Sequence, residues 1–440
     1  MEHNAQYNEN ATVAYFPNLS ATITTSNNPA HPSSPVVKST GSKIVPWGDD
    51  NLFPQNVTKA AEKTFLPTGI RFQTLALYGS LEYGRYVYEG EGANKKRIFV
   101  PDSIPEIDDW LERTNINRYL LEAGSDFYWF YNFFPELVLS NDRKQIAAIS
   151  VQEATYCRFE WPSTQTNLCE NVYINANWDN GGTPDSAETI KVPTIDPYYD
   201  PVGNLLARKD GFKFIYPVSY PSPGKSFYQI APWDSLRKNG WLEIAALIPA
   251  WKKSLMKNQL SIKYHIQIPE NYWRWKYKNW DEMSQDEQVK ARKDEMEAFN
   301  KFVTGEANAG KSIITSSQFD ATTKTEYPGW KITVLDDKFK DGSYIEDSQE
   351  ASAHLLFGLG VDGTLIGNSP GKSMGAGSGS DKRVAYNMYI QTRKAEEDLL
   401  LEPLHFIRKY NGWDPALRFR IARNEITTLD TGSSTKPANN

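Results

Sequence analysis

Residues 341–410 read DGSYIEDSQEASAHLLFGLGVDGTLIGNSPGKSMGAGSGSDKRVAYNMYIQTRKAEEDLLLEPLHFIRKY, and this stretch decides the fold. Its first part, 343–360, predicts a helix, because apolar residues recur at helical spacing on one face. These residues are Tyr344, Ala351, Leu355 and Leu359, with Ile345 and Leu356 widening the face. Ser343, followed one turn later by Glu346, has the form of a capping box and marks the start of the helix.

The middle part of this stretch, 361–382, is rich in glycine, which disfavours a regular element. The glycines are Gly363, Gly367, Gly371, Gly375, Gly377 and Gly379. We therefore predict a loop here, either a plain flexible linker or a contact loop between its flanking helices.

The last part, 383–410, predicts a long helix with Asp381 as its N-cap. Its expected apolar stripe consists of Val384, Met388, Ala395 and Leu399. Pro403 should kink this helix near its end, because proline removes a backbone donor and clashes with the preceding turn.

The composition describes an ordinary globular chain with many aromatic residues. The 440 residues suffice for two or three subdomains and include 13 Trp, 24 Tyr and 20 Phe, residues that cores and subunit interfaces favour. The net charge of −6 argues against a protein that holds nucleic acid tightly, though DNA could still pass through it. The longest nearly apolar run, 242–251, contains Glu243 and Pro249 and is too short to span a bilayer, so we expect no membrane association.

Outside the deciding stretch, the first half of the chain predicts a mixed α+β body. Residues 1–42 are rich in Asn, Ser, Thr and Pro and predict a loosely ordered arm. A hairpin is expected around Gly90 and Gly92, and a helix over 105–124, ending at Gly124. The aromatic run that follows, DFYWFYNFFPELVLS, and the later IAAISV predict an antiparallel meander.

The second half alternates again between helix and mixed structure. Residues 235–265 predict a helix with an apolar face and several lysines, and 266–340 predict a small α+β insertion between two helices. After residue 412 we expect a short strand and a polar tail, 413–440.

One motif suggests a nucleotide site. GEANAGKS, Gly305–Ser312, satisfies the phosphate-loop pattern, which requires a preceding strand and a following helix. Here the order is inverted, with a helical pattern before the motif and β-branched IITSS after it. We interpret the segment as a helix-to-strand turn, and a P-loop-like nucleotide-binding enzyme remains the alternative.

No catalytic or metal-binding constellation emerges from the remaining polar residues. His354 and His405 lie on or beside apolar helix faces, which favours core or interface roles over metal ligation. Cys157 and Cys169 have no nearby histidine, so they indicate neither a zinc site nor a disulfide framework, and whether they are bonded stays open. We therefore predict a non-enzymatic chain without cofactor.

The order of these segments resembles the portal proteins of tailed bacteriophages along about residues 46–410. The sequence WGDDNLFP, 47–54, is similar to the opening of some portal families, and 119–158 is similar to their wing region. The resemblance implies these parts in order: a flexible N-terminal arm (1–42), wing (43–234), first stem helix (235–265), clip (266–340), second stem helix (341–360), tunnel loop (361–382), long kinked helix (383–412) and a reduced crown (413–440).

By this resemblance the protein would form a homo-oligomeric ring, typically of twelve subunits, at one capsid vertex of the virion, assembled in the host cytoplasm. Double-stranded DNA would be packaged through the ring by a terminase and later ejected. The implied partners are the terminase large subunit, the major capsid protein and a head–tail adaptor. Another phage structural protein, such as the adaptor itself, is a further alternative.

Two groups of residues carry the site predictions. The tunnel loop would present polar and basic side chains to DNA: Asn368, Ser369, Lys372, Ser373, Lys382 and Arg383. A second hypothesis pairs basic and acidic stem helices of neighbouring subunits through Lys252, Lys253, Lys257, Glu346, Asp347 and Glu350.

Overall fold

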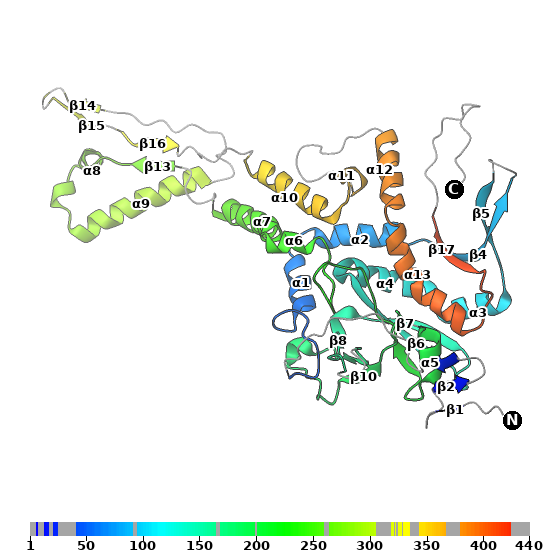
Figure 1. Cartoon of the computed structure of the whole chain (residues 1–440). Coiled ribbons are helices and arrows are strands. Elements are labelled where there is room, and N and C mark those ends of the chain that lie inside the picture. The colour runs from blue at the N-terminus through cyan, green and yellow to red at the C-terminus, as the bar shows by residue number, and fades with distance from the viewer. Residues whose placement is uncertain are drawn as a thin grey trace, which may run out of the picture. The chain divides into compact units, whose positions relative to one another are not determined.

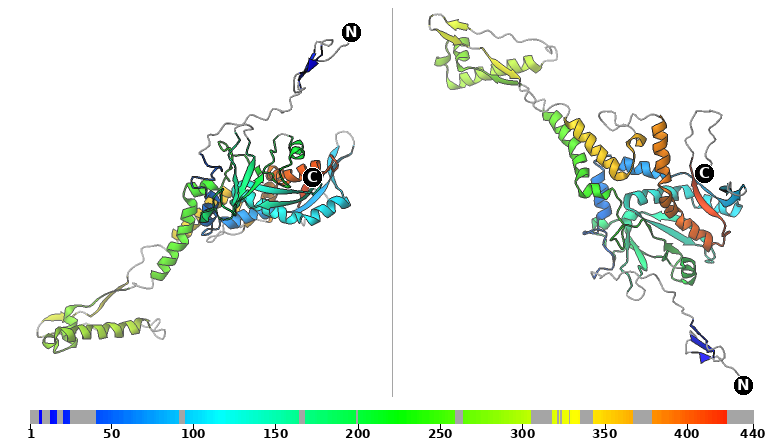
Figure 2. Two further views of the ribbon diagram at one scale, coloured as in Figure 1. Left: turned by 90° about the horizontal axis from the view of Figure 1, so that it is seen from below. Right: turned by 45° about the horizontal axis from the view of Figure 1, so that its top comes forward.

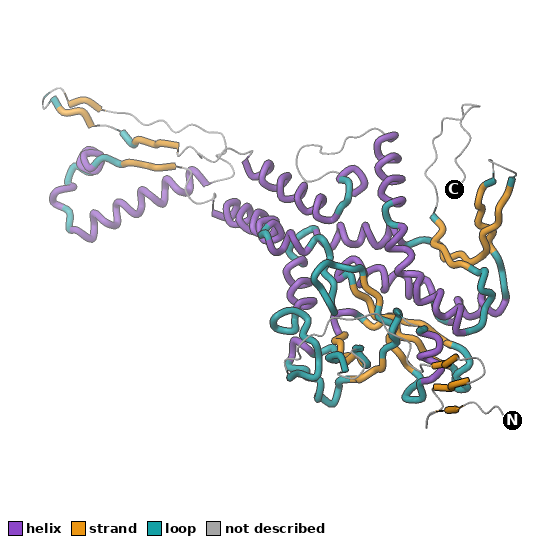
Figure 3. The backbone as a smooth tube through the Cα atoms, in the orientation of Figure 1, coloured by secondary structure: helices purple, strands orange, loops and turns teal. Residues whose placement is uncertain are grey.

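The computed structural model (Figure 1) describes residues 6–7, 13–16, 21–24, 41–90, 95–163, 168–198, 200–258, 264–304, 318–320, 322, 324–327, 329–334, 343–366 and 379–423. The chain divides into two units. The first unit comprises Met1–Ala246 and Ile345–Asn440, and the second comprises Leu247–Tyr344. Each unit mixes helices and strands (Figure 3), which confirms the predicted α+β class.

The N-terminal residues contain regular structure that the sequence did not predict. Strands β1 (Gln6–Tyr7), β2 (Val13–Phe16) and β3 (Ala21–Thr24) form a three-stranded antiparallel sheet. The prediction of a loosely ordered arm over 1–42 is therefore wrong for these strands. They are short and rich in β-branched and aromatic residues, which suit a pleated ladder although the surrounding composition is polar.

The helices of the first unit's body begin with α1 (Phe53–Ala61) and α2 (Leu66–Leu77). The single helix predicted over 105–124 is two helices, α3 (Pro105–Arg113) and α4 (Ile116–Phe130), separated where Asn115 adopts a left-handed φ of 51°. Helix α4 continues through Gly124 and ends at Tyr131. The predicted strand start at DFYWF is wrong, because burial of Phe127 and its aromatic neighbours on one helix face outweighs their β propensity.

The central sheet is built on β6 (Asn132–Leu139), which is buried along almost its whole length. It pairs antiparallel with β7 (Ile146–Gln152), so the predicted meander is confirmed from residue 132 onward. Strands β11 (Lys213–Ile215) and β12 (Val218–Ser219) both pair with β6 rather than with each other.

Two further sheets complete the body of the first unit. One has the order β10 (Ile190–Pro193), β9 (Asn171–Ile174), β8 (Cys157–Phe159). The other contains the predicted hairpin, β4 (Ser80–Glu89) and β5 (Lys96–Pro101), and adds β17 (Arg418–Ala422) from the far end of the chain. Short elements join these sheets: η3 (Ala154–Tyr156), η4 (Trp178–Asn180) and α5 (Pro201–Ala207).

The helix predicted over 235–265 is divided. Helix α6 (Asp234–Lys238) stops before Gly240, whose φ of 91° breaks the helix, and α7 (Trp241–Asn258) follows with Pro249 inside it. His265 lies in a strand, β13 (Tyr264–Gln267), so the predicted C-terminal end of this helix is wrong. A left-handed glycine supplies the break that apolar periodicity alone cannot reveal.

The second unit contains the small α+β structure predicted around 266–340. Strand β13 pairs with β16 (Lys331–Val334), and β14 (Gln318–Asp320) pairs with β15 (Thr325–Tyr327). Its helical elements are α8 (Glu270–Lys276), η5 (Trp280–Glu282) and α9 (Gln285–Thr304). Stacking of Trp273 on Trp280, with ring centroids 5.5 Å apart, joins α8 to η5.

The remaining helices of the first unit come from the stretch that opened the sequence analysis. They are α10 (Ser343–Leu359), α11 (Gly363–Ile366), α12 (Gly379–Gln391) and α13 (Lys394–Tyr410). Ser343 is the first residue of α10. The predicted loop over 361–382 thus contains one helical turn and the start of another helix, and its residues 367–378 lie outside the described residues.

One buried carboxyl in this fold has a testable pH dependence. Asp126 accepts a hydrogen bond of 2.8 Å from the Ala154 amide, and burial raises the pKa of this carboxyl from 3.8 to about 8. Since the folded pKa exceeds the unfolded one, the stability contributed by the protonated form is complete below about pH 4 and is lost as the pH rises toward about 8.

We expect Asp126→Asn to remove this dependence, because the Asn side-chain oxygen can accept the same bond without ionising. Denaturant unfolding should show wild type losing stability relative to the variant between about pH 4 and about pH 8. Parallel pH curves for the two proteins would contradict this assignment.

Candidate functional site: the helices flanking the glycine-rich loop

Helix α10 is anchored in the first unit along the face that the sequence predicted. Ala351, Leu355 and Leu359 are buried, whereas Ile345 is exposed and does not widen that face. The side-chain amide of Gln73 on α2 donates a hydrogen bond of 2.7 Å to the Leu359 carbonyl. Gly69 lets α2 approach closely, since a Cβ there would overlap Leu359. The end of α10, which leads into the loop, is therefore held firmly.

The same helix contacts α6 and the start of α7. His354 stacks on Trp241, with ring centroids 3.8 Å apart, and its Nε2 lies 4.0 Å from a carboxylate oxygen of Glu350. His354 thus packs against an aromatic ring, in agreement with a core or interface role. His405 on α13 is largely buried near Phe419, and burial lowers its pKa to about 4.

The predicted long helix is broken between α12 and α13, at Thr392 and Arg393, and not at Pro403. The Arg393 guanidinium donates to a carboxylate oxygen of Glu396 at 2.7 Å and lies over the Tyr389 ring at 4.3 Å. The Tyr128 hydroxyl donates to the other Glu396 oxygen at 2.8 Å. This buried set holds the elbow between the two helices to α4.

The predicted apolar stripe across this break is wrong. Val384 and Met388 are 53% and 64% exposed, and Ala395 is exposed as well. Because α12 and α13 are separate helices, helical spacing counted across the break does not select one face. The side chains that pack α13 are instead Leu400, Leu401, Leu404, Phe406 and Ile407.

The predicted DNA-facing residues are only partly described. Lys382 and Arg383 lie in the first turns of α12, on a helix and not in a loop, and Lys382 is exposed. Asn368, Ser369, Lys372 and Ser373 lie outside the described residues, as does the Gly305–Ser312 motif. Helix α9 precedes that motif, as expected.

The stem predictions fall on exposed helical surface. Lys252 and Lys253 are exposed on α7, and Lys257 belongs to the same helix. Glu346, Asp347 and Glu350 are exposed on α10. One helix therefore presents positive charge and the other negative charge, and pairing between copies of the chain stays a prediction.

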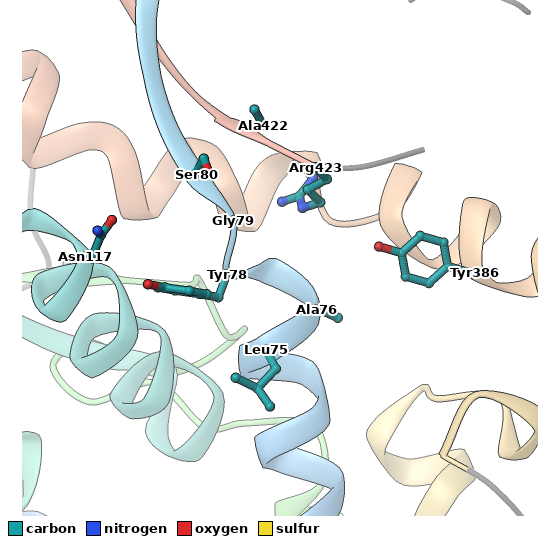
Figure 4. Close-up of a pocket in the computed structure, with 9 residues that line it drawn as sticks. All are labelled: Leu75, Ala76, Tyr78, Gly79, Ser80, Asn117, Tyr386, Ala422 and Arg423. Atoms are coloured by element: carbon teal, nitrogen blue, oxygen red, sulfur yellow. The ribbon is translucent and has the colours of Figure 1, made fainter. Parts of the chain in front are cut away.

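A pocket missed by the sequence lies between four segments of the first unit (Figure 4). Its volume is about 400 Å³, and its lining consists of Leu75, Ala76, Tyr78, Gly79, Ser80, Asn117, Tyr386, Ala422 and Arg423. The Arg423 guanidinium is occupied by Glu397, whose carboxylate oxygen lies 3.2 Å away. With its only cation already paired, the pocket offers no arrangement for catalysis.

The chemistry of the rest of the chain agrees with this. Among the described residues, no cluster of His, Cys, Asp or Glu could hold a metal ion. Cys157 and Cys169 are free thiols, which answers the question left open by the sequence. Across the part of the chain that the structure describes, every helix is too short or too polar to form a membrane span.

Comparison with known proteins identifies the fold through solved structures alone. No protein-family model matches the chain, and no curated protein matches it. A chain from the neck of an empty gene transfer agent particle, determined with C6 symmetry, superimposes with a TM-score of 0.54 at 15% identity and with 87% of each chain covered. This chain shares its fold with a particle neck protein.

Two related structures give the same result. A chain from the neck of the native gene transfer agent particle, determined with C12 symmetry, has a TM-score of 0.52 at 14% identity over 88% of each chain. A chain from the virion of the native particle has a TM-score of 0.53 at 14% identity over 84% of each chain. The shared fold therefore spans nearly the whole molecule, including both units.

Proposed function

We propose that this chain is a structural, non-enzymatic subunit of the head–tail neck of a phage-like particle, and that within the neck it is the portal. The supporting observation is the shared fold over 84% to 88% of the chain with neck and virion proteins from particles determined with C6 and C12 symmetry. Such coverage leaves little of the chain for an additional catalytic domain.

The portal assignment is supported by the order of elements. Helices α7 and α10 precede and follow a small α+β unit, and α10 leads through the glycine-rich segment into the elbow of α12 and α13. The net charge of −6 suits a conduit, because an acidic chain does not hold the phosphate backbone tightly. Lys382 and Arg383 at the start of α12 would make transient contacts with passing DNA.

In this proposal twelve copies form a ring at the capsid vertex of the virion, assembled in the host cytoplasm. The ring admits double-stranded DNA driven by the terminase large subunit and later releases it. It contacts the major capsid protein on one side and a head–tail adaptor on the other. No cofactor or membrane takes part.

The first test is the shape of the purified protein. We expect negative-stain images to show closed rings with an axial hole, and mass photometry to find a particle many times the 50.0 kDa of one chain. A compact monomer without an opening would refute the proposal.

A second observation separates a portal from a head–tail adaptor. Particle-producing cells that lack this protein should accumulate heads without DNA, since packaging requires the portal. DNA-filled heads without tails would instead assign the chain to the adaptor position in the neck.

A further inference from the structure

Helix α7 has apolar residues on two opposite sides. Leu242 and Ala245 are buried inside the first unit, whereas Ile244 and Leu247 are 42% and 56% exposed. With 3.6 residues per turn, these two pairs lie about 160° apart around the helix axis. An apolar stripe opposite to a helix's own packing face indicates a second partner.

Helix α10 has the same two-sided arrangement. Its inner face carries Ala351 and Leu355, and its outer face carries Glu346, Glu350 and Phe357, again about 160° around the helix. Phe357 is 87% exposed, an unusual position for a large aromatic side chain. An aromatic residue displayed in this way is typical of an anchor in a protein interface.

The two inner faces meet within one chain. Trp241 at the start of α7 stacks on His354 of α10, and the two helices run side by side in both views of Figure 2. Gly358 of α10 fits against Leu236 of α6, where a Cβ would lie 2.5 Å from the Leu236 Cδ1 atom. Because the inner faces are joined, the outer faces of α7 and α10 are directed away from each other.

Two different outward surfaces on one molecule are the requirement for a head-to-tail contact that repeats around a closed ring. A two-fold dimer would instead bring identical surfaces together. The charges beside the two surfaces are opposite, with Lys252 on α7 and Glu346 and Glu350 on α10. Opposite charges at the rim favour contact between unlike surfaces and oppose contact between like ones.

We propose that the outer face of α10 in one copy covers the outer face of α7 in the next copy, with Phe357 packed on Ile244 and Leu247. This contact rests on the proposed ring and names the apolar anchor that closes it. The rim charges then set the register, while burial of the Phe357 ring supplies the main attraction.

The first experiment replaces the anchor on each side. We expect Phe357→Glu and Leu247→Glu each to convert rings into 50.0 kDa monomers in mass photometry, with far-ultraviolet circular dichroism unchanged. The matched control is Ile190→Glu on β10, because Ile190 is 62% exposed but lies on neither helix, and its rings should persist. Intact rings in both helix variants would overturn this contact and leave the proposed function standing. A wild-type chain that never forms rings would overturn both.

The second experiment tests the direction of the contact. A chain carrying both Leu247→Cys and Phe357→Cys should give an oxidised ladder of multimers on a non-reducing gel, and neither single variant should. The wild type supplies the background from the free thiols of Cys157 and Cys169. Disulfide-linked dimers from either single variant would show like faces meeting, and would overturn the head-to-tail arrangement.

Discussion

Arg158→Ala should lower the free energy of unfolding by about 3–5 kcal/mol, because it removes a buried cation whose donors are all used. The Arg158 side chain is fully buried, and its guanidinium makes five hydrogen bonds of 2.7 to 3.3 Å. The acceptors belong to Asn51, Gln55, Thr155 and Cys157. These bonds tie the segment before α1 to β8, and truncation leaves their acceptors buried without a partner.

The electrostatics of Arg158 explain why lysine is no substitute. Burial lowers the pKa of its guanidinium to about 10, so it stays charged at neutral pH although its hydrogen-bond acceptors are neutral oxygens. The Trp47 and Trp178 rings lie 5.5 and 5.4 Å from its Cζ atom and add cation–π attraction. A lysine keeps the charge but cannot make the forked contacts, so Arg158→Lys should lose much of the same stability.

Urea unfolding followed by circular dichroism measures both variants. The matched control is Arg113→Ala, whose side chain forms an exposed ion pair with Asp109 at 2.8 Å. We expect that control to change stability by less than about 0.5 kcal/mol. Equal midpoints for Arg158→Ala and Arg113→Ala would contradict the structural role given to Arg158.

Gly84→Ala should destabilise the first unit by about 2 kcal/mol or more, because a new methyl group has no space at that position. Gly84 is opposite Pro101 in the β4–β5 ladder. A Cβ on Gly84 would overlap the Val100 carbonyl oxygen and lie 2.9 Å from the Pro101 Cα. Both obstacles are backbone atoms, so strand β5 would have to move.

Gly124→Ala is the matched control and should have the opposite sign. Gly124 lies inside α4, and a Cβ there would make an ordinary contact of 3.5 Å with the Thr74 methyl group. Alanine is better suited to a helix interior by about 0.5–1 kcal/mol, so thermal unfolding should move upward. If Gly124→Ala destabilised the protein as much as Gly84→Ala, the helical assignment of residues 124–130 would be in error.

Local patterns predicted several elements correctly for a physical reason. The buried positions of α10 at Ala351, Leu355 and Leu359 follow from helical spacing, and the β4–β5 hairpin follows from alternation around Gly90. Both patterns depend on residues a few positions apart, which the sequence displays directly. The same reasoning extended to the α+β class of the insertion between α7 and α10.

The incorrect predictions arose where distant segments compete with local preference. The aromatic run after Gly124 has high β propensity, yet Phe127 lies on the buried face of α4. Pro403 was expected to bend the last helix, but α13 continues through it. The actual break is beside Arg393, where Glu396 and Tyr389 hold the guanidinium. No residue count can show such a contact in advance.

From its order of residues alone, this chain specifies its α+β class, the separate unit enclosed by α7 and α10, and the opposite charges on those two helices. Spacing along the backbone is sufficient for these features, since each depends on neighbours within a few turns. The three-dimensional fold alone decides that β17 joins β4, that the elbow lies at Arg393, and that Phe357 faces away from its own core. These depend on which surfaces of remote segments meet, and that is settled by burial of apolar area across the whole molecule.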